Sequence, residues 1–430
     1  MADSDSQDKF DAIVIGAGPS GCACAYALAK KGKNVLVVEK GDPPGCKNVS
    51  GGRLYTYALE MLEPGMYKRA PLQRKVVREQ IMMLGTADAT TIDYVNYGFA
   101  EGTPQSYTVL RASLDAWFAD EVQNAGGTVA GGIKVDELIE KDGTVIGIKA
   151  GSDEMYATVV IAAEGVNGQL SQKAGLFGDL TPECVGVGVK EVIKLDEQTI
   201  NARFNVPSDE GAARVAIGCT EGIMGGAFLY TNKESISLGI VFNPGQAAKH
   251  GKRIHDILQD FKMHPAILAL IEGGTTIEYG AHLVPELGLA GVPHRLYKDG
   301  FVVVGDAARF GINTGIIIRG MDLAIVSGLA AANAVLKARS VPEIGPEYMN
   351  QLNELMLLPN LKEFAGYHNI FDSPRVFSQY PHIANESMKY MFTVSGRVPE
   401  KMTSAIWQVI RQNVRFSQLA ADGWKVYRSI

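Results

Sequence analysis

Three glycines and a carboxylate near the N-terminus have the types and spacing needed to bind a dinucleotide. Gly16, Gly18 and Gly21 follow the apolar run IVI, and Glu39 ends the next apolar run, NVLVVE. The first two glycines would allow a tight turn and a close approach to a pyrophosphate, whose charge the following helix N-terminus stabilises. A carboxylate at this place accepts hydrogen bonds from ribose hydroxyls and disfavours a 2′-phosphate. NADP is therefore disfavoured, while NAD and FAD both remain open.

The surroundings of these glycines predict a strand, a helix and a second strand. The apolar residues 13–15 precede the glycines, and a helix with small side chains is expected to begin at Gly21 and end near Lys31. Such a context separates a dinucleotide site from an ordinary glycine-rich turn. Pro19 and Ser20, inside the motif, and Lys40, directly after the second strand, are included in the expected cofactor site.

A second motif near residue 300 favours FAD. The apolar run FVVV ends at Gly305 and Asp306, and an Ala-rich helical segment follows. An acidic side chain at a strand end can accept a hydrogen bond from a ribityl hydroxyl, and the next helix N-terminus would favour charge on the flavin N1/C2=O edge. Nicotinamide proteins have no need of such a second site. Gly311 and Asn313, in the segment between, are included in the expected site.

Composition and charge exclude several classes of protein. The chain has 430 residues, a net charge of −6 and 46% hydrophobic residues, which predicts at least two packed domains and no nucleic-acid partner. The longest apolar segments are interrupted by charges, and residues 1–9 are polar and acidic, so we expect neither a spanning helix nor a targeting peptide. The five cysteines lack Cys-x-x-Cys spacing, so we expect no metal site, and they suit the reducing cytoplasm.

The two motifs resemble the FAD-binding signatures of the glutathione-reductase-type flavoproteins. More narrowly, VVVGDAARF and RGMDLAIVSG resemble the branch that contains electron-transfer-flavoprotein:quinone oxidoreductases, Fix C proteins and geranylgeranyl reductases. In the segment VLRASLDAWF, the resemblance implies that Arg111 reaches the cofactor. In IAAEGVNG it implies that Glu164 and Gly165 form the turn that usually reads A-D-G-x-x-S, with Glu164 in place of the usual Asp.

The loop Ser50-Gly51-Gly52 has two interpretations. It is either a flexible turn or a place where backbone approaches the isoalloxazine ring, and the resemblance favours the flavin. His282 and Tyr230 are candidates in a substrate-facing sheet, although ordinary packing accounts for each of them more simply. No residue is assigned as catalytic.

The expected fold class is α/β. A Rossmann-like FAD-binding domain of the glutathione reductase type is expected from residues 1–75, 100–165 and 290–345. Short alternating runs such as CVGVGVKEVIKL predict an inserted antiparallel β-sheet over residues 170–290, facing the substrate or quinone. Residues 346–430 are expected to form a helical C-terminal region that contacts a membrane or a partner.

The resemblance also implies a function. It implies a subunit that passes electrons from an electron-transfer flavoprotein, with α- and β-type subunits, through FAD to a quinone. Because no cysteine follows Cys219, the chain resembles the Fix C type, in which a small ferredoxin-like subunit supplies the iron–sulfur cluster. In some systems that assembly bifurcates electrons from NADH between quinone and ferredoxin. The alternative is an isoprenoid lipid reductase of the geranylgeranyl reductase kind.

The last segment of the chain departs from the acidic average. Residues 396–430 are rich in Lys and Arg, and SAIWQVIRQNV places Trp407, Ile410 and Val414 on one helical face. A basic amphipathic helix lies on anionic lipid or docks a partner, whereas an ordinary helix packs on its own domain. The first interpretation predicts a peripheral protein on the inner face of the cell membrane.

Overall fold

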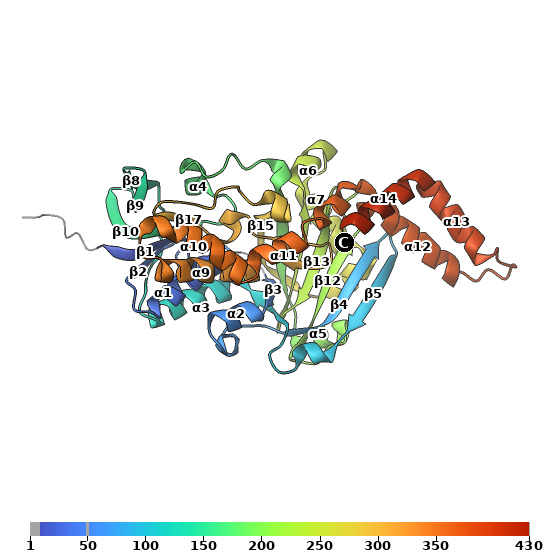
Figure 1. The fold of residues 1–430 in the computed structure, drawn as a ribbon. Helices are drawn as coiled ribbons and strands as arrows, with labels where there is room; N and C mark the ends of the chain where they lie inside the picture. The colour runs from blue at the N-terminus through green and yellow to red at the C-terminus, as the bar shows by residue number, and fades with distance from the viewer. Residues whose placement is uncertain (1–8, 49–50, 430) are drawn as a thin grey trace, which may run out of the picture.

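In its described residues the chain folds into two large β-sheets and one two-stranded sheet, with helices around them and a helical C-terminal region after them (Figure 1). The computed structural model describes residues 9–48 and 51–429. The expected α/β fold with a Rossmann-like domain is confirmed.

The first sheet has a core of parallel strands in the order β7, β2, β1, β10 and β17. Its strands are nearly continuous apolar runs, as is typical of parallel strands buried on both faces. Ile15 is level with Val38 and with Ala162, so the carboxyl ends of β1, β2 and β10 meet at one edge. Ligands bind at this edge of open parallel sheets. The bounds are β1 (Phe10–Ile15), β2 (Val35–Val38), β7 (Thr128–Ala130), β10 (Asp153–Ala162) and β17 (Phe301–Val303), with β16 (Tyr297–Lys298), β8 (Glu137–Lys141) and β9 (Thr144–Ala150) attached antiparallel.

Three helices pack together beside this sheet. α1 (Pro19–Ala29) contacts both α3 (Arg111–Asn124) and α9 (Met321–Lys337). The approach of α1 to α9 requires a glycine, because a Cβ at Gly328 would lie 2.1 Å from the carbonyl oxygen of Ser20. The first and second motifs are thereby held against each other.

The second sheet is mixed, and its strands come from two stretches of sequence. Its order is β15, β11, β14, β13, β12, β4, β6 and β3, with β5 beside β4, and only the β12–β4 pair among these strands is parallel. Strands from residues 51–110 thus join those of the expected 170–290 sheet, because β4 pairs with β12 along its length. The bounds are β3 (Gly51–Tyr55), β4 (Lys75–Leu84), β5 (Ala89–Val95), β6 (Ser106–Leu110), β11 (Val185–Lys194), β12 (Glu210–Ile217), β13 (Gly225–Thr231), β14 (Ser235–Phe242) and β15 (Thr275–Pro285).

Shorter helices connect these strands. They are α2 (Tyr57–Leu62), α4 (Gln169–Lys173), α5 (Glu197–Phe204), α6 (Pro244–His250), α7 (Ile254–Met263) and α8 (Pro265–Ile271). A two-stranded hairpin, β18 (Ile312–Asn313) with β19 (Ile318–Arg319), precedes α9.

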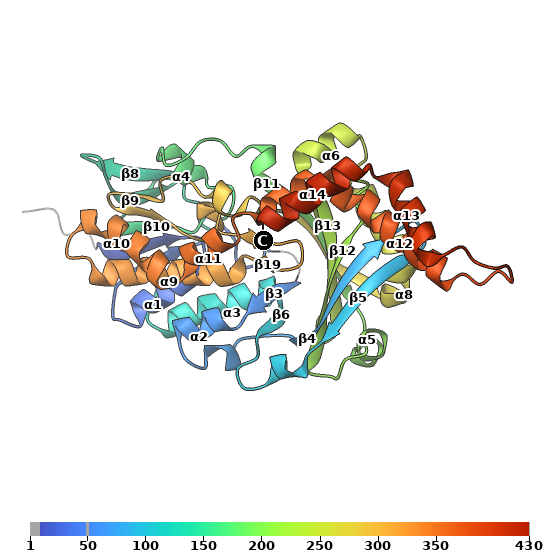
Figure 2. The ribbon, with the colours of Figure 1, turned by 45° about the vertical axis from the view of Figure 1, so that its right-hand side comes forward.

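The C-terminal helices lie over one end of the second sheet (Figure 2). α12 (Gln379–Phe392) packs on β4 and β5, and Asn385 donates to the Met83 carbonyl at 3.0 Å. Asp422 links the last helix to the segment before α12. Arg375 in that segment donates to both carboxylate oxygens of Asp422, at 2.6 and 2.7 Å. The other bounds are α10 (Val341–Glu354), α11 (Leu357–Glu363), α13 (Met402–Asn413), α14 (Phe416–Ser429) and the 3-10 helices η6 (Tyr367–Asp372) and η7 (Pro374–Phe377).

The apolar face expected for residues 404–414 is partly buried and partly exposed in the structure. Val414 is buried and Ile410 half-buried, but the Trp407 side chain is 46% exposed. α13 packs on α12, so part of this face serves the chain's own domain. In the part of the chain that the structure describes, no helix is both long and apolar enough to cross a membrane.

Candidate functional site

A cavity of about 910 Å³ lies between the carboxyl edge of the parallel sheet and one face of the second sheet. The loops after β1, β2, β10 and β17 line one side, and β11, β13 and the end of β15 line the other. Phe371 and Phe377, from η6 and η7, line it as well. Three separate parts of the chain therefore build one site.

The structure places most of the residues expected from sequence on this cavity. Those that line it are Gly16, Gly18, Pro19, Ser20, Glu39, Lys40, Gly51, Gly52, Arg111, Glu164, Gly165, Asp306, Gly311 and Asn313. Gly21 and Gly305 do not line the cavity. They pack against the lining residues Gly16 and Ser20. Ser50 lies outside the described residues. The individual roles of these residues remain predictions.

The three glycines of the first motif have different surroundings. A Cβ at Gly21 would lie 2.0 Å from the carbonyl oxygen of Gly16, and one at Gly16 would lie 2.3 Å from that of Ala163. A Cβ at Gly18 would meet nothing within 4 Å. Gly16 and Gly21 thus permit close packing, whereas Gly18 leaves open space beside the N-terminus of α1, where a pyrophosphate fits.

The Glu39 carboxylate is oriented by the backbone around it. One oxygen accepts from the Ala17 N–H at 2.9 Å and the other from the Gly41 N–H at 2.7 Å. Each carboxylate oxygen keeps a free lone pair. The geometry therefore suits acceptance of ribose hydroxyls from an FAD whose pyrophosphate lies at Gly18.

The second motif places the acidic side chain of Asp306 near the basic side chains of Arg111 and Lys190. Asp306 lines the cavity, and burial raises the pKa of its carboxyl while Arg111 and Lys190 oppose that rise. Arg111 donates to both carboxylate oxygens of Asp115 at 3.0 and 2.8 Å, which fixes its guanidinium. Gly305 has a φ of +64°, and a Cβ there would lie 2.5 Å from the Ser20 hydroxyl oxygen. The two motifs are therefore in direct contact.

Glu164 is committed to another element. Its carboxylate accepts from the backbone N–H groups of Leu170 and Ser171, each at 2.8 Å, and from the Ser171 hydroxyl at 2.6 Å. These bonds cap α4, so the carboxylate stabilises that helix N-terminus. The neighbouring Gly165, at φ +73°, shapes the turn beside the cavity.

The second sheet supplies Lys190, which the sequence did not single out, and His282, which the sequence named as a candidate. On β11, Gly186, Gly188 and Lys190 alternate onto one face, and His282 on β15 lies level with Gly188. The glycines leave room above the sheet, while Lys190 and His282 face the cavity. The alternation of residues in the VGVGVK run could have predicted that Lys190 lies on the same face of the strand as the two glycines.

Burial dominates the titration of these groups. Burial, followed by the charge of Arg111, lowers the pKa of Lys190 to about 8. Burial, followed by the charges of Lys190 and Arg111, lowers the pKa of His282 to about 4. Near neutral pH the His282 ring is therefore uncharged, while Arg111 and Lys190 give this end of the cavity positive charge beside Asp306.

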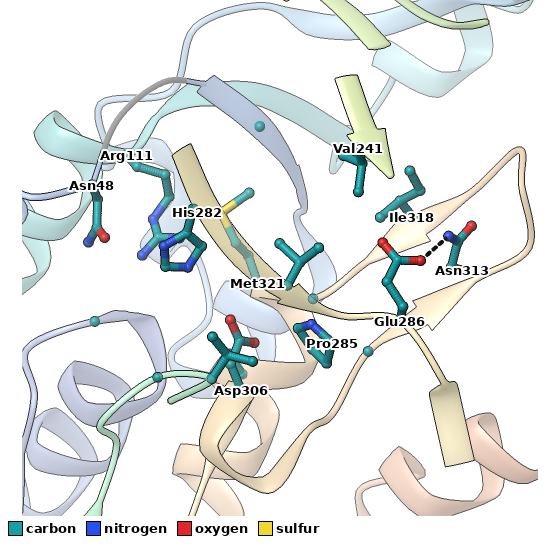
Figure 3. Close-up of a pocket in the computed structure, with 18 of the residues that line it drawn as sticks. Asn48, Arg111, Val241, His282, Pro285, Glu286, Asp306, Asn313, Ile318 and Met321 are labelled. Carbon is teal, nitrogen blue, oxygen red and sulfur yellow. Dashed lines mark hydrogen bonds between the residues drawn. The ribbon is translucent and has the colours of Figure 1, made fainter. Parts of the chain in front are cut away.

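The other end of the cavity is mainly apolar and contains a hydrogen-bonded polar pair. The Asn313 amide donates to Glu286 at 2.9 Å, and Figure 3 shows this pair with Val241 and Ile318, away from Arg111 and Asn48. Phe371, whose ring would meet a Cβ at Gly315 at 3.0 Å, closes this end. Sequence reasoning missed Glu286 and Phe371 because neither lies in a motif.

Family models match three parts of the chain. Residues 11–86 match "FAD dependent oxidoreductase", residues 185–284 match "ETF-QO, ubiquinone-binding", and residues 367–430 match "ETF-QO/FixC family C-terminal domain". All three matched stretches contribute residues to the cavity. In the described residues, no group of three or more His, Cys, Asp or Glu is placed to hold a metal ion.

Curated relatives cover nearly the whole chain. The probable electron transfer flavoprotein-quinone oxidoreductase YdiS of Escherichia coli K12 is 45% identical, covering 91% of this chain and 92% of that protein. Protein FixC of E. coli O157:H7 is 40% identical, covering 98% and 99%. A geranylgeranyl bacteriochlorophyll reductase-like structure from Thermoplasma acidophilum shares the fold, with a TM-score of 0.69, 21% identity, and 94% and 96% coverage. The chain thus belongs to the FixC and electron transfer flavoprotein-quinone oxidoreductase family, and it is an FAD-dependent oxidoreductase.

Proposed function

We propose that this chain takes electrons from an electron-transfer flavoprotein and passes them through FAD to a quinone. One observation carries the proposal: the cavity continues from a polar end that fits FAD into an apolar end lined by Val241, Ile318 and Phe371. A mostly apolar pocket with a few polar groups is the usual form of a small-molecule site. The names of the relatives support the same donor and acceptor.

The chain's residues have separate tasks in this proposal. Bound FAD supplies one- or two-electron transfer, and the protein positions it between donor and acceptor. Gly18, the α1 N-terminus and Glu39 bind the dinucleotide. Arg111 and Lys190 place positive charge beside Asp306, where negative charge on a reduced ring would be stabilised.

We propose that the loop between α12 and α13 rests on the membrane surface. Phe392, Val394 and Val398 in or next to it are 82%, 95% and 96% exposed. Arg397 and Lys401 stand beside these apolar side chains. Exposed apolar residues next to basic ones suit the boundary of an anionic bilayer. Such a bilayer carries the quinone.

A ferredoxin-like iron–sulfur partner and electron bifurcation from NADH are included in the proposal. Both rest on the family resemblance. The sequence has no cysteine after Cys219, so a cluster in this assembly would come from a second chain.

Reconstitution in liposomes tests the function. The flavin-loaded chain is mixed with a reduced electron-transfer flavoprotein and vesicles containing ubiquinone, with and without a ferredoxin-like partner. We expect quinol to form only when the flavoprotein is present. Isoprenoid saturation without quinol formation would overturn the proposal in favour of a lipid reductase. Vesicles that fail to sediment the protein would overturn the membrane contact.

A further inference from the structure

The apolar end of the cavity contains a carboxyl group that the electron path does not use. Glu286 directly follows β15 and lines the cavity beside Pro285 (Figure 3). Its position is fixed by the sheet below, because a Cβ at Gly186 would lie 2.6 Å from a Glu286 carboxylate oxygen. A glycine at 186 therefore lets this carboxyl lie flat on β11 and face the cavity.

Glu286 is linked to the apolar end through Asn313. The Asn313 amide donates to the carboxyl at 2.9 Å, and Asn313 pairs with Ile318 across the β18–β19 hairpin. Ile318 and Phe371 line the same end. The carboxyl thus adjoins the space that the proposed function assigns to the quinone ring.

We infer that Glu286 is the proton donor to the quinone bound in this end of the cavity. The inference rests on the proposed function and deepens it. Reducing a quinone to a quinol takes two electrons and two protons. The electrons come from the reduced cofactor. The Glu286 O–H bond breaks as one quinone O–H bond forms, solvent water provides the other proton, and the carboxylate then regains a proton from solvent.

The charge state of Glu286 suits this task. Burial raises its pKa to about 7, and the Asn313 hydrogen bond, which favours the ionised form, opposes the rise. A general acid works best with a pKa near the operating pH. The other titratable groups that line the cavity on the nearby strands and helices include His282 on β15, Lys190 on β11, Tyr230 on β13, Arg53 on β3, Arg111 on α3, Asp306 after β17 and Arg319 on β19.

Two of these groups need separate consideration. The pKa of His282 is lowered to about 4, so its ring does not titrate near neutrality. The pKa of Lys190 is lowered to about 8, which is close enough to produce a pH step of its own. The test therefore includes a Lys190→Met variant. A change of rate with pH that is due to Glu286 is expected to persist in this variant.

The test follows the reoxidation of the pre-reduced, flavin-loaded protein without any partner. The protein is reduced photochemically and mixed with a short-tailed ubiquinone or with ferricyanide, which accepts electrons without protons. For Glu286→Gln we expect reoxidation by the quinone to slow by about 10²-fold, the scale of general acid catalysis. Reoxidation by ferricyanide stays unchanged. The Gln amide still donates a hydrogen bond, so the quinone concentration needed for half-saturation changes little.

The pH profile distinguishes a donor from a structural residue. In the natural chain, reoxidation by quinone should slow as the pH rises through about 7, because the donor becomes ionised. Glu286→Gln removes this step. Asn313→Ala removes the bond that favours the ionised form, so the step moves to higher pH. Infrared difference spectra of the flavin-free protein between acid and alkaline buffer should show a protonated-carboxyl band that Glu286→Gln lacks.

The exposed Glu272→Gln serves as the matched control and should behave as the natural chain does. Equal quinone rates in Glu286→Gln and the natural chain would overturn the inference alone. A natural chain that ferricyanide reoxidises and quinone does not would overturn the proposed function and the inference with it.

Discussion

The two sides of the cavity are built on different principles. The side formed by the parallel sheet uses backbone: the open space at Gly18, the helix N-terminus after it and the N–H groups that orient Glu39. The side formed by the second sheet uses side chains, namely Lys190, His282 and Glu286, above glycines that leave room for them. In the proposed function, the first side binds the cofactor, and the second side helps to tune it and takes part in the reaction.

The largest expected effect is at Gly18. Gly18→Val places a side chain in the open space beside the α1 N-terminus, so we expect FAD to be lost while the chain stays folded, since nothing lies within 4 Å of that Cβ position. Flavin absorbance per chain after purification, with circular dichroism for folding, is the measurement. Gly178→Val, at another open glycine, is the control. A fully flavinated Gly18→Val protein would contradict the role of the first side.

A smaller effect is expected at Lys190. Lys190→Met removes a positive charge from the second side, so electrons on the bound ring should be less favoured. We expect the two-electron potential to fall by about 30 mV, which corresponds to about 1.4 kcal/mol. Spectroelectrochemical titration measures it, with the exposed Lys194→Met as control. An unchanged potential, with FAD still bound, would mean that the second side does not tune the cofactor.

The smallest effect is expected at Ile318. Its side chain lines the apolar end and is 44% exposed, so Ile318→Ala costs the fold little. Loss of about 1 kcal/mol of apolar contact should raise the KM for quinone about fivefold and leave FAD binding unchanged. Steady-state kinetics with a short-tailed ubiquinone measure this, and Ile277→Ala, 53% exposed outside the cavity, is the control. A rise in both variants would argue against a quinone at this end.

The same difference explains what the sequence could predict. Gly16, Gly18, Gly21 and Glu39 lie within one strand–helix–strand unit, so their spacing alone predicts where they meet. The second motif was predictable because Gly305 and Asp306 come directly after a short apolar strand. The pairing of the two motifs across the sheet was predictable from the resemblance to known flavoproteins.

The second side could not be predicted in this way. Lys190 and Glu286 come from β11 and the end of β15, and only the pairing of those strands brings them to one cavity. Tyr230 on β13 and His282 on β15, which the sequence named as candidates, line the same cavity. Strands β3–β6 also escaped prediction, because their place in the sheet depends on the parallel pairing of β4 with β12. Phe371 and Phe377 lie in 3-10 helices that carry no sequence period of their own.

The order of strands in the two sheets has a consequence for biosynthesis. β1 and β2 leave the ribosome early, but β17 and the Gly305-Asp306 turn that completes the same edge lie beyond residue 300. Strand β4 likewise cannot pair with β12 until β12 has been synthesised, more than a hundred residues later in the chain. A nascent chain therefore carries the first half of the nucleotide site without the second for most of its synthesis. Flavin is therefore expected to be captured stably only after the Gly305-Asp306 turn has been synthesised.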